Sequence, residues 1–202
     1  MSISEEKIYD LVAVYGSPRR HGNTSTLLSH AVQGAKDAGF SVGEFFLRDL
    51  NISPCLEVYK CQQDGECAIK DDFQALRDRI LGSKGLILAS PIFFYTVTAQ
   101  TKAFMDRFQS LWVRKYRIDQ EQGKRPFKRR GAFVSAGATR GPRLFEGAVL
   151  SVRYFFDVLD MELRDSLLCR GLDAEKDVLE HPDYLEKAYK LGYILSSSLA
   201  DE

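Results

Sequence analysis

Short apolar runs alternate along the chain with longer stretches in which apolar residues recur at helical spacing. Residues 8–15 form the first apolar run, and their β-branched and aromatic side chains are typical of a buried parallel strand. From Leu27 to Ala35 the apolar positions follow a helical period, which predicts a helix that begins near Thr24. The same patterns predict further strands at 41–47, 85–89, 131–136 and 163–168. They also predict a helix that begins at 71 or 72, and three more helices over 99–116, 144–159 and 182–199.

This repeated alternation predicts an α/β fold, a doubly wound five-stranded parallel sheet with helices on both faces. The strand at 41–47 is shorter and more polar than the first, so we expect it near an edge of the sheet. Ligands of such sheets bind beyond the carboxyl ends of the strands, where the loops after the first, third and fourth strands can meet. Because the 202 residues contain no internal repeat and no low-complexity linker, we expect a single domain over residues 1–202.

Composition and charge narrow the possible partners. Hydrophobic residues make up 45% and charged residues 28% of the chain, as in ordinary globular proteins. Lys and Arg together number 28, as do Asp and Glu, so no global charge favours nucleic acid or an anionic membrane. No apolar run approaches the length of about 18 residues that spans a bilayer, and the N-terminus lacks a signal-peptide pattern. We therefore expect a cytoplasmic protein whose four cysteines are thiols or ligands rather than disulfides.

The loop between the first strand and the first helix has the composition of an anion site. Small residues and hydroxyls fill it from Gly16 to Thr24, where backbone N–H groups converge on the positive end of the helix dipole. The ligand that this arrangement predicts is a phosphate, although an ordinary polar turn with a good N-cap would also fit. The candidate side-chain donors are Ser17, Asn23, Thr24 and Ser25, with Arg19 or Arg20 adding a charge-assisted bond.

Three familiar phosphate sites do not match this loop. A P-loop has four residues between its glycines and then a Lys, whereas here five residues separate Gly16 from Gly22 and Asn23 follows. The dinucleotide fingerprint Gly-x-Gly-x-x-Gly is absent, and no Cys lies between Gly16 and Ser25 to act as a phosphatase nucleophile.

Two segments of the chain resemble a known family. The run Gly16-Ser-Pro-Arg19 followed by Gly22-Asn-Thr-Ser25 resembles the FMN phosphate loop of the flavodoxin-like NAD(P)H-dependent FMN reductases, closest to their iron–sulfur flavoprotein branch. The segment from Ser90 to Arg107 resembles the loop and helix that bind the isoalloxazine ring in that family. The resemblance implies bound FMN and covers nearly the whole chain.

The loop after the third strand carries an aromatic cluster that needs a large flat partner unless it is simply core. With the resemblance, the Ser90 hydroxyl and the backbone amides that follow are expected at the polar edge of the flavin ring, where such donors tune its reduction potential. The candidate residues of this loop are Ser90, Pro91, Ile92, Phe93, Phe94 and Tyr95.

A third loop follows the fourth strand. Ser135 and Gly137 offer small residues where a ring could lie close to the backbone, and the family's flavin commonly borders this loop. Arg140 or Arg143 could reach the flavin O2 or the nicotinamide phosphate, and a solvated surface loop is the alternative.

The resemblance implies an FMN-dependent oxidoreductase that passes electrons from NAD(P)H to a small acceptor such as a quinone, a nitro or azo compound, or a ferric chelate. The flavin supplies the chemistry, so no catalytic side chain is named. Two alternatives stay open. One is an iron–sulfur flavoprotein-type electron carrier, and the other is a non-catalytic flavin-binding protein.

The segment from Cys55 to Cys67 resembles the iron–sulfur flavoprotein loop, in which four cysteines follow the pattern Cys-x-x-Cys-x-x-Cys-x-x-x-x-x-Cys. Cys55, Cys61 and Cys67 occupy the first, third and fourth places, and Val58 occupies the second. A four-iron cluster normally takes four thiolates. Cys169 is too remote in sequence to be assumed as a substitute. We therefore expect no cluster, and free thiols at the mouth of the active site.

Other arrangements of this loop remain possible. The three thiolates could bind a metal with another ligand or water, or zinc together with Asp64 or Glu66.

Two further predictions concern partners. The aromatic face that Phe104, Phe108 and Trp112 form is larger than packing against one face of the sheet requires. Together with the resemblance, this predicts a homodimer or a dimer of dimers. The basic segment 114–130 is either a solvated loop or an arm that receives the extra phosphate of NADPH or an acidic partner.

Overall fold

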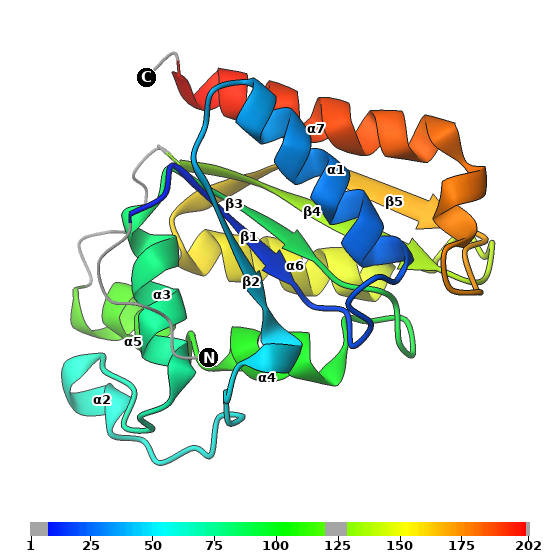
Figure 1. Ribbon diagram of the computed structural model, residues 1–202. Coiled ribbons are helices and arrows are strands. Elements are labelled where there is room, and N and C mark those ends of the chain that lie inside the picture. The colour runs from blue at the N-terminus through cyan, green and yellow to red at the C-terminus, as the bar shows by residue number, and fades with distance from the viewer. Residues whose placement is uncertain (1–7, 120–128, 201–202) are drawn as a thin grey trace.

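The computed structural model describes residues 8–119 and 129–200, and its centre is a sheet of five parallel strands (Figure 1). The strand order is β2-β1-β3-β4-β5, the flavodoxin-like order of a doubly wound sheet. This confirms the predicted fold class and places β2 at an edge, as its polar composition indicated. The strands are β1 (Leu11–Tyr15), β2 (Val42–Phe46), β3 (Gly85–Ala89), β4 (Arg129–Gly137) and β5 (Met161–Arg170).

Helices cover both faces of this sheet, with α1 and α7 on one face and α3 to α6 on the other (Figure 1). The helices are α1 (Asn23–Asp37), α2 (Cys61–Asp64), α3 (Asp72–Gly82), α4 (Ala99–Asp106), α5 (Gln109–Val113), α6 (Glu146–Val158) and α7 (Pro182–Ala200). Three shorter turns are η1 (Leu47–Asp49), η2 (Arg114–Ile118) and η3 (Asp177–Glu180).

Alternation along β1 divides the core into two parts. Leu11, Ala13 and Tyr15 pack under α1 and α7, whereas Val12 and Val14 pack toward α3 and α4. All five side chains are buried, as expected of a central parallel strand. The parallel register then brings the carboxyl ends of β1, β3 and β4 to one edge of the sheet.

The structure corrects one predicted helix. The helical pattern over 99–116 predicts a continuous helix, but α4 ends at Asp106, α5 begins at Gln109, and the chain continues as a π-helical turn. The break lies at Arg107, whose guanidinium is buried against the loop before α3. A pattern of apolar positions does not reveal such a partner.

The argument for a dimer from the aromatic face also changes. Phe104 and Phe108 are buried in the core with Phe73 and Phe155, so they are not surplus to the sheet face. Trp112 remains partly exposed and lines a surface hollow.

No helix in the described ranges 8–119 and 129–200 is long and apolar enough to cross a membrane. Most of the basic segment 114–130 lies outside these ranges.

Candidate functional site

The carboxyl edge of the sheet holds a cavity of about 190 Å³. Its walls come from the loops after β1 and β3, from the end of β4 and the residue beyond it, and from residues that follow β5. The loops that the sequence predicted to meet do meet here, and Leu172 and Asp173 add a wall that the prediction lacked. The predicted site residues that line the cavity are Ser17, Arg19, Asn23, Thr24, Pro91, Ile92, Phe93 and Gly137.

The phosphate loop, residues 16–25, is fastened at its start by the amino end of α4. The carbonyl oxygen of Gly16 accepts hydrogen bonds from Thr98 Oγ1 at 2.7 Å, Gln100 Nε2 at 3.0 Å and Thr101 Oγ1 at 3.3 Å. Residue 16 must be glycine here, because a Cβ would lie 2.1 Å from Thr101 Oγ1 and 2.6 Å from the Ala89 carbonyl. The sequence analysis missed these three positioning residues, although Thr98 before the helical pattern is a recognisable N-cap.

The first turn of α1 leaves its donors open. No side chain caps this helix, and within the described part of the chain the N–H groups of Asn23, Thr24 and Ser25 have no partner. The hydroxyl of Thr24 and the guanidinium of Arg19 likewise have no partner among the described residues, and both residues line the cavity. Unpaired donors at a helix N-terminus attract an anion.

Asn23, Ser25 and Arg20 are engaged in holding the fold, whereas the Ser17 hydroxyl accepts the Arg19 N–H at 3.1 Å and lines the cavity. The side-chain amide of Asn23 donates to the Ala174 carbonyl at 2.8 Å and accepts from the Val178 N–H at 3.1 Å. Ser25 Oγ donates to the Arg19 carbonyl at 2.9 Å. Arg20 pairs with Asp49 and is therefore not the free arginine of the loop.

Asn23 is thus placed as a link between the phosphate loop and the segment after β5. Its two partners are more than 150 residues away in sequence.

The two predicted serines beyond β3 and on β4 are fully buried and act within the fold. Ser90 Oγ donates to the Pro91 carbonyl and accepts from the Thr98 N–H, both at 3.0 Å. Ser135 Oγ donates to the Ser90 carbonyl at 2.7 Å. Both hydroxyls therefore shape the loop after β3 rather than facing the cavity.

The aromatic cluster forms an exposed turn. Phe93 and Thr96 exchange backbone hydrogen bonds, and the two residues between them have positive φ values, 49° at Phe94 and 62° at Tyr95. Positive φ is uncommon for aromatic residues and costs of order 1–3 kcal/mol each. The Phe94 side chain is 100% exposed, which excludes the core-packing alternative for it.

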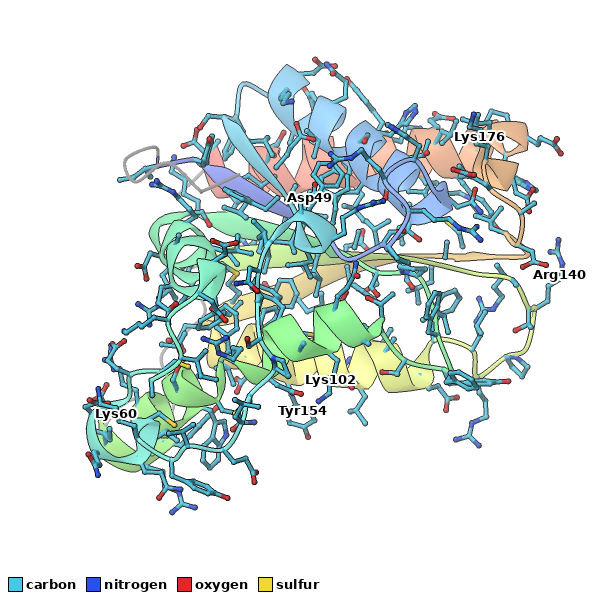
Figure 2. All side chains as sticks on the ribbon, turned by 60° about the horizontal axis from the view of Figure 1, so that its bottom comes forward. Asp49, Lys60, Lys102, Arg140, Tyr154 and Lys176 are labelled. Carbon is cyan, nitrogen blue, oxygen red and sulfur yellow. The ribbon has the colours of Figure 1, made fainter. Side chains whose placement is uncertain are left out.

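The loop after β4 closes over small residues. Gly137 lies against Leu144 and Ile92, and Arg140 lies over Gly171 beyond β5. Figure 2 shows Arg140 projecting at one end of the molecule. Arg143 is mostly exposed and pairs with Glu146 at 2.8 Å, and neither arginine lines the cavity at the strand ends.

The cysteine loop, residues 50–70, lies away from this cavity. Its three cysteines line a separate hollow of about 520 Å³ that also borders Trp112, and in Figure 2 the neighbouring Lys60 lies at the end of the molecule opposite Arg140. The expectation that these thiols border the mouth of the active site was therefore wrong for the cavity at the strand ends.

A buried cation holds the base of the cysteine loop. Arg107 is 1% exposed and donates to the Ser53 carbonyl at 2.9 Å, to the Ile69 carbonyl at 2.8 Å, to Asp71 Oδ2 at 2.7 Å and to Cys67 Sγ at 3.2 Å. Burial alone would raise the pKa of the Asp71 carboxyl, but Arg107 and two backbone N–H groups outweigh it, so that pKa is lowered.

The cysteine loop offers one thiol fewer than the four that a four-iron cluster normally takes. Cys169 is buried in the core on the other face of the sheet, and burial raises the pKa of its thiol to about 12. Only three cysteines remain at the loop, and no three His, Cys, Asp or Glu residues within 8–119 and 129–200 are arranged to hold a metal ion.

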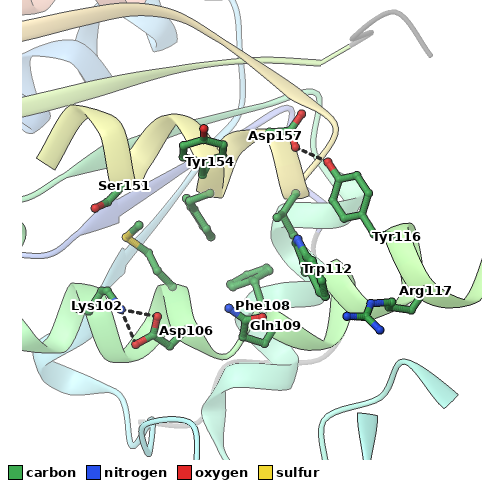
Figure 3. Close-up of a pocket in the computed structure, with 13 residues that line it drawn as sticks. Lys102, Asp106, Phe108, Gln109, Trp112, Tyr116, Arg117, Ser151, Tyr154 and Asp157 are labelled. Carbon is green, nitrogen blue, oxygen red and sulfur yellow. Dashed lines mark hydrogen bonds and ion pairs between the residues drawn. The ribbon is translucent and has the colours of Figure 1, made fainter. Parts of the chain in front are cut away.

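A second surface hollow, of about 700 Å³, lies between α4, α5 and α6. In Figure 3, Lys102 and Asp106 on α4 face Ser151 and Tyr154 on α6 across it, and a hydrogen bond from Tyr116 to Asp157 closes one end. The apolar part of its lining comes from Met105, Phe108, Phe155 and Val158.

FMN fits the donor set at the strand ends. A phosphate monoester would meet the open N–H groups of α1, the Thr24 hydroxyl and the Arg19 guanidinium, all of which border one cavity. The exposed aromatic turn lies next to that cavity through Phe93 and offers a face for a flat ring.

Comparison with known proteins agrees with this geometry. Residues 9–163 match the sequence model of a family described as NADPH-dependent FMN reductase. An iron–sulfur flavoprotein of Archaeoglobus fulgidus is 38% identical over 96 residues, which are 48% of this chain and 44% of that protein. YwqN of Bacillus subtilis, named by inference as an NAD(P)H-dependent FMN-containing oxidoreductase, is 27% identical over 183 residues, 90% of this chain and 95% of that protein.

The fold is shared with solved structures. An NAD(P)H:quinone oxidoreductase from Methanothermobacter marburgensis superposes with a TM-score of 0.69 at 17% identity, over 94% of this chain and 96% of that one. The chain spans about half the length of the first curated relatives that it matches. Because the family match covers most of the sequence, the chain belongs to the NADPH-dependent FMN reductase family, a family of flavin-dependent oxidoreductases, as the sequence predicted.

Proposed function

We propose that this protein binds FMN and passes electrons from NAD(P)H to a small acceptor, such as a quinone, a nitro or azo compound, or a ferric chelate. The observation that carries the proposal is the open donor set of α1, Thr24 and Arg19 beside an exposed aromatic turn. When bound, FMN supplies the exchange of electrons between nicotinamide and acceptor.

The chain's own residues bind and orient in this proposal. Arg19 and Thr24 hold the phosphate. The Gly16 carbonyl, at the start of the phosphate loop, is fixed by Thr98, Gln100 and Thr101. The fully exposed ring of Phe94, at the tip of its turn, is available to contact the flavin or the molecules that exchange electrons with it.

Anaerobic turnover with NADPH and a quinone tests the proposal in the FMN-loaded protein. We expect oxidation of NADPH that depends on both FMN and quinone. A protein that binds FMN but shows no turnover with quinone, nitro, azo or ferric acceptors would instead be a flavin-binding protein without this activity.

Substitution of Phe94 separates binding from folding in the same assay. Phe94→Gly removes a fully exposed ring and relieves a positive φ, so stability should stay the same or rise by up to about 1 kcal/mol. A loss of turnover in this stable variant supports the aromatic face as part of the site. Unchanged kinetics would exclude Phe94 from it.

The iron–sulfur carrier is the second candidate, because several curated relatives are named iron–sulfur flavoproteins. Iron and sulfide analysis after anaerobic purification decides between the two. About four irons per chain would favour the carrier.

We also propose a homo-oligomer in which a second copy covers the hollow between α4 and α6. Exposed aromatic side chains border it at Tyr154 on α6 and at Tyr116 on η2, and Leu150 is also exposed on α6. Sedimentation should show a species larger than the 22.9 kDa chain, and only that mass at micromolar concentration would contradict it. The predicted cytoplasmic location stays a prediction.

A further inference from the structure

The cysteine loop gathers three thiols that the proposed function does not use. Cys55 is exposed, whereas Cys61 and Cys67 are partly buried, and all three line one hollow of about 520 Å³. Burial and then the negative charges of Cys55 and Cys67 raise the pKa of the Cys61 thiol.

The three thiols differ in how firmly they are held. The sulfur of Cys67 accepts the Nε–H of Arg107 at 3.2 Å, and the guanidinium is itself fixed by three more oxygen acceptors. Cys61 lies at the first position of α2. Cys55 has no such anchor in the described chain, and its sulfur is the most accessible of the three.

The backbone between Cys55 and Cys61 contains two residues in the left-handed region. Glu57 and Tyr59 both have positive φ, at 50° and 62°, which non-glycine residues rarely adopt. The same short segment exposes Leu56, Val58 and Tyr59 to solvent. A bond between the two cysteines would close this apolar segment into a small ring.

We propose that Cys55 and Cys61 form a reversible disulfide in response to peroxide, which makes the cysteine loop a thiol modification site. The Cys55 thiolate attacks one peroxide oxygen, the O–O bond breaks, and Cys55 becomes a sulfenic acid while hydroxide leaves. The Cys61 thiolate then attacks that sulfur, the S–S bond forms, and the S–O bond breaks with loss of hydroxide. The two protons that the thiols released convert both hydroxides to water. Two thiols are oxidised and one hydrogen peroxide is reduced to two waters.

The positions of the tryptic cleavage sites allow the pairing of the cysteines to be identified from peptide masses. Cleavage after Arg48, Lys60 and Lys70 leaves Cys55 in peptide 49–60, and Cys61 and Cys67 together in peptide 61–70. A disulfide that includes Cys55 joins the two peptides, whereas a Cys61–Cys67 bond stays within the second.

The experiment exposes the FMN-loaded full chain to hydrogen peroxide, removes the oxidant with catalase, blocks free thiols and analyses the unreduced tryptic digest by mass spectrometry. We expect peptides 49–60 and 61–70 to be joined, and dithiothreitol to separate them. The Cys67→Ser variant should keep the joined pair, and the Cys55→Ser and Cys61→Ser variants should lose it.

Any other pattern overturns the proposal. Such patterns are a bond within peptide 61–70, a joined pair that persists in Cys61→Ser, sulfinic or sulfonic acids without a disulfide, a bond between two chains on a nonreducing gel, or four unmodified thiols. Because these readouts are peptide masses, they do not depend on turnover and remain informative if the proposed activity fails.

Discussion

The phosphate loop and the cysteine loop are both held by α4 and the residues that flank it, but in opposite ways. At the start of α4, three uncharged side chains donate hydrogen bonds to a single carbonyl, that of Gly16. After its last residue, one cation, Arg107, donates to four acceptors in the cysteine loop and Asp71. In the first loop three donors share one acceptor. In the second, one buried cation serves four acceptors, and Asp71, Asp72, Gln74, Arg77 and Arg114 add further contacts.

The difference follows from what each loop leaves available. The phosphate loop keeps Arg19, Thr24 and the first N–H groups of α1 open, because neighbouring side chains supply its support. In the cysteine loop the buried charge is consumed by the fold, and of the three thiols only that of Cys55 is exposed. An anion site is preorganised when other groups hold its backbone and leave some of its donors open.

The largest effect is expected at Arg107, a buried cation that serves four acceptors. Arg107→Met should lower the free energy of unfolding by about 3–5 kcal/mol, because it leaves Asp71 buried without its cation. Urea denaturation of the purified protein measures this loss.

The matched control is Lys102→Met on the same helix. Lys102 pairs with Asp106 at 2.6 Å, but both side chains are exposed, and such pairs contribute about 0–1 kcal/mol. Similar losses in the two variants would contradict the assignment of Arg107 as the main buried support of the cysteine loop.

The next effect concerns ligand binding in the phosphate loop. Arg19→Gln and Thr24→Val should each weaken FMN about tenfold or more, because hydrogen bonds to a charged group contribute about 1.5–3 kcal/mol. Riboflavin, which lacks the phosphate, should bind these variants and the original chain equally. Fluorescence titration with both flavins measures the difference, and Arg20→Gln, whose residue already pairs with Asp49, should change neither affinity.

The same titration shows whether Asn23 contacts the phosphate or only positions the phosphate loop. Asn23→Ala breaks the link to Ala174 and Val178, so it should weaken FMN and riboflavin by similar factors and also lower stability. Loss of FMN affinity alone would mean that the amide contacts the phosphate.

These contrasts also show which features a sequence can predict. The span of β3 is predicted residue for residue, because Gly85 begins its apolar run and Ser90-Pro91 ends it. The phosphate loop is predicted as an anion site from its composition. The separate tasks of its donors are not, because the partners of Asn23 lie beyond β5 and those of Gly16 on α4. The break in the helix at Arg107 likewise depends on a distant loop.

A smaller effect should appear as pH falls. The pKa of Asp71 is lowered in the folded protein, so its contribution to stability is present above the unfolded carboxyl pKa of about 4 and is lost as pH falls through the lower folded value. Between about pH 5 and pH 2, the original chain should lose more stability than Asp71→Asn, which cannot titrate. Parallel curves from denaturation at each pH would contradict this linkage.

The smallest effect tests the redundancy of the phosphate loop. Gln100→Ala or Thr101→Val removes one of three donors to the Gly16 carbonyl, so each should cost about 1 kcal/mol or less in the free energy of unfolding. With both removed, the carbonyl keeps only Thr98, and the double variant should lose more than the sum of the two, by about 0.5 kcal/mol or more. A single variant that costs about 3 kcal/mol would mean that the Gly16 carbonyl depends mainly on one donor.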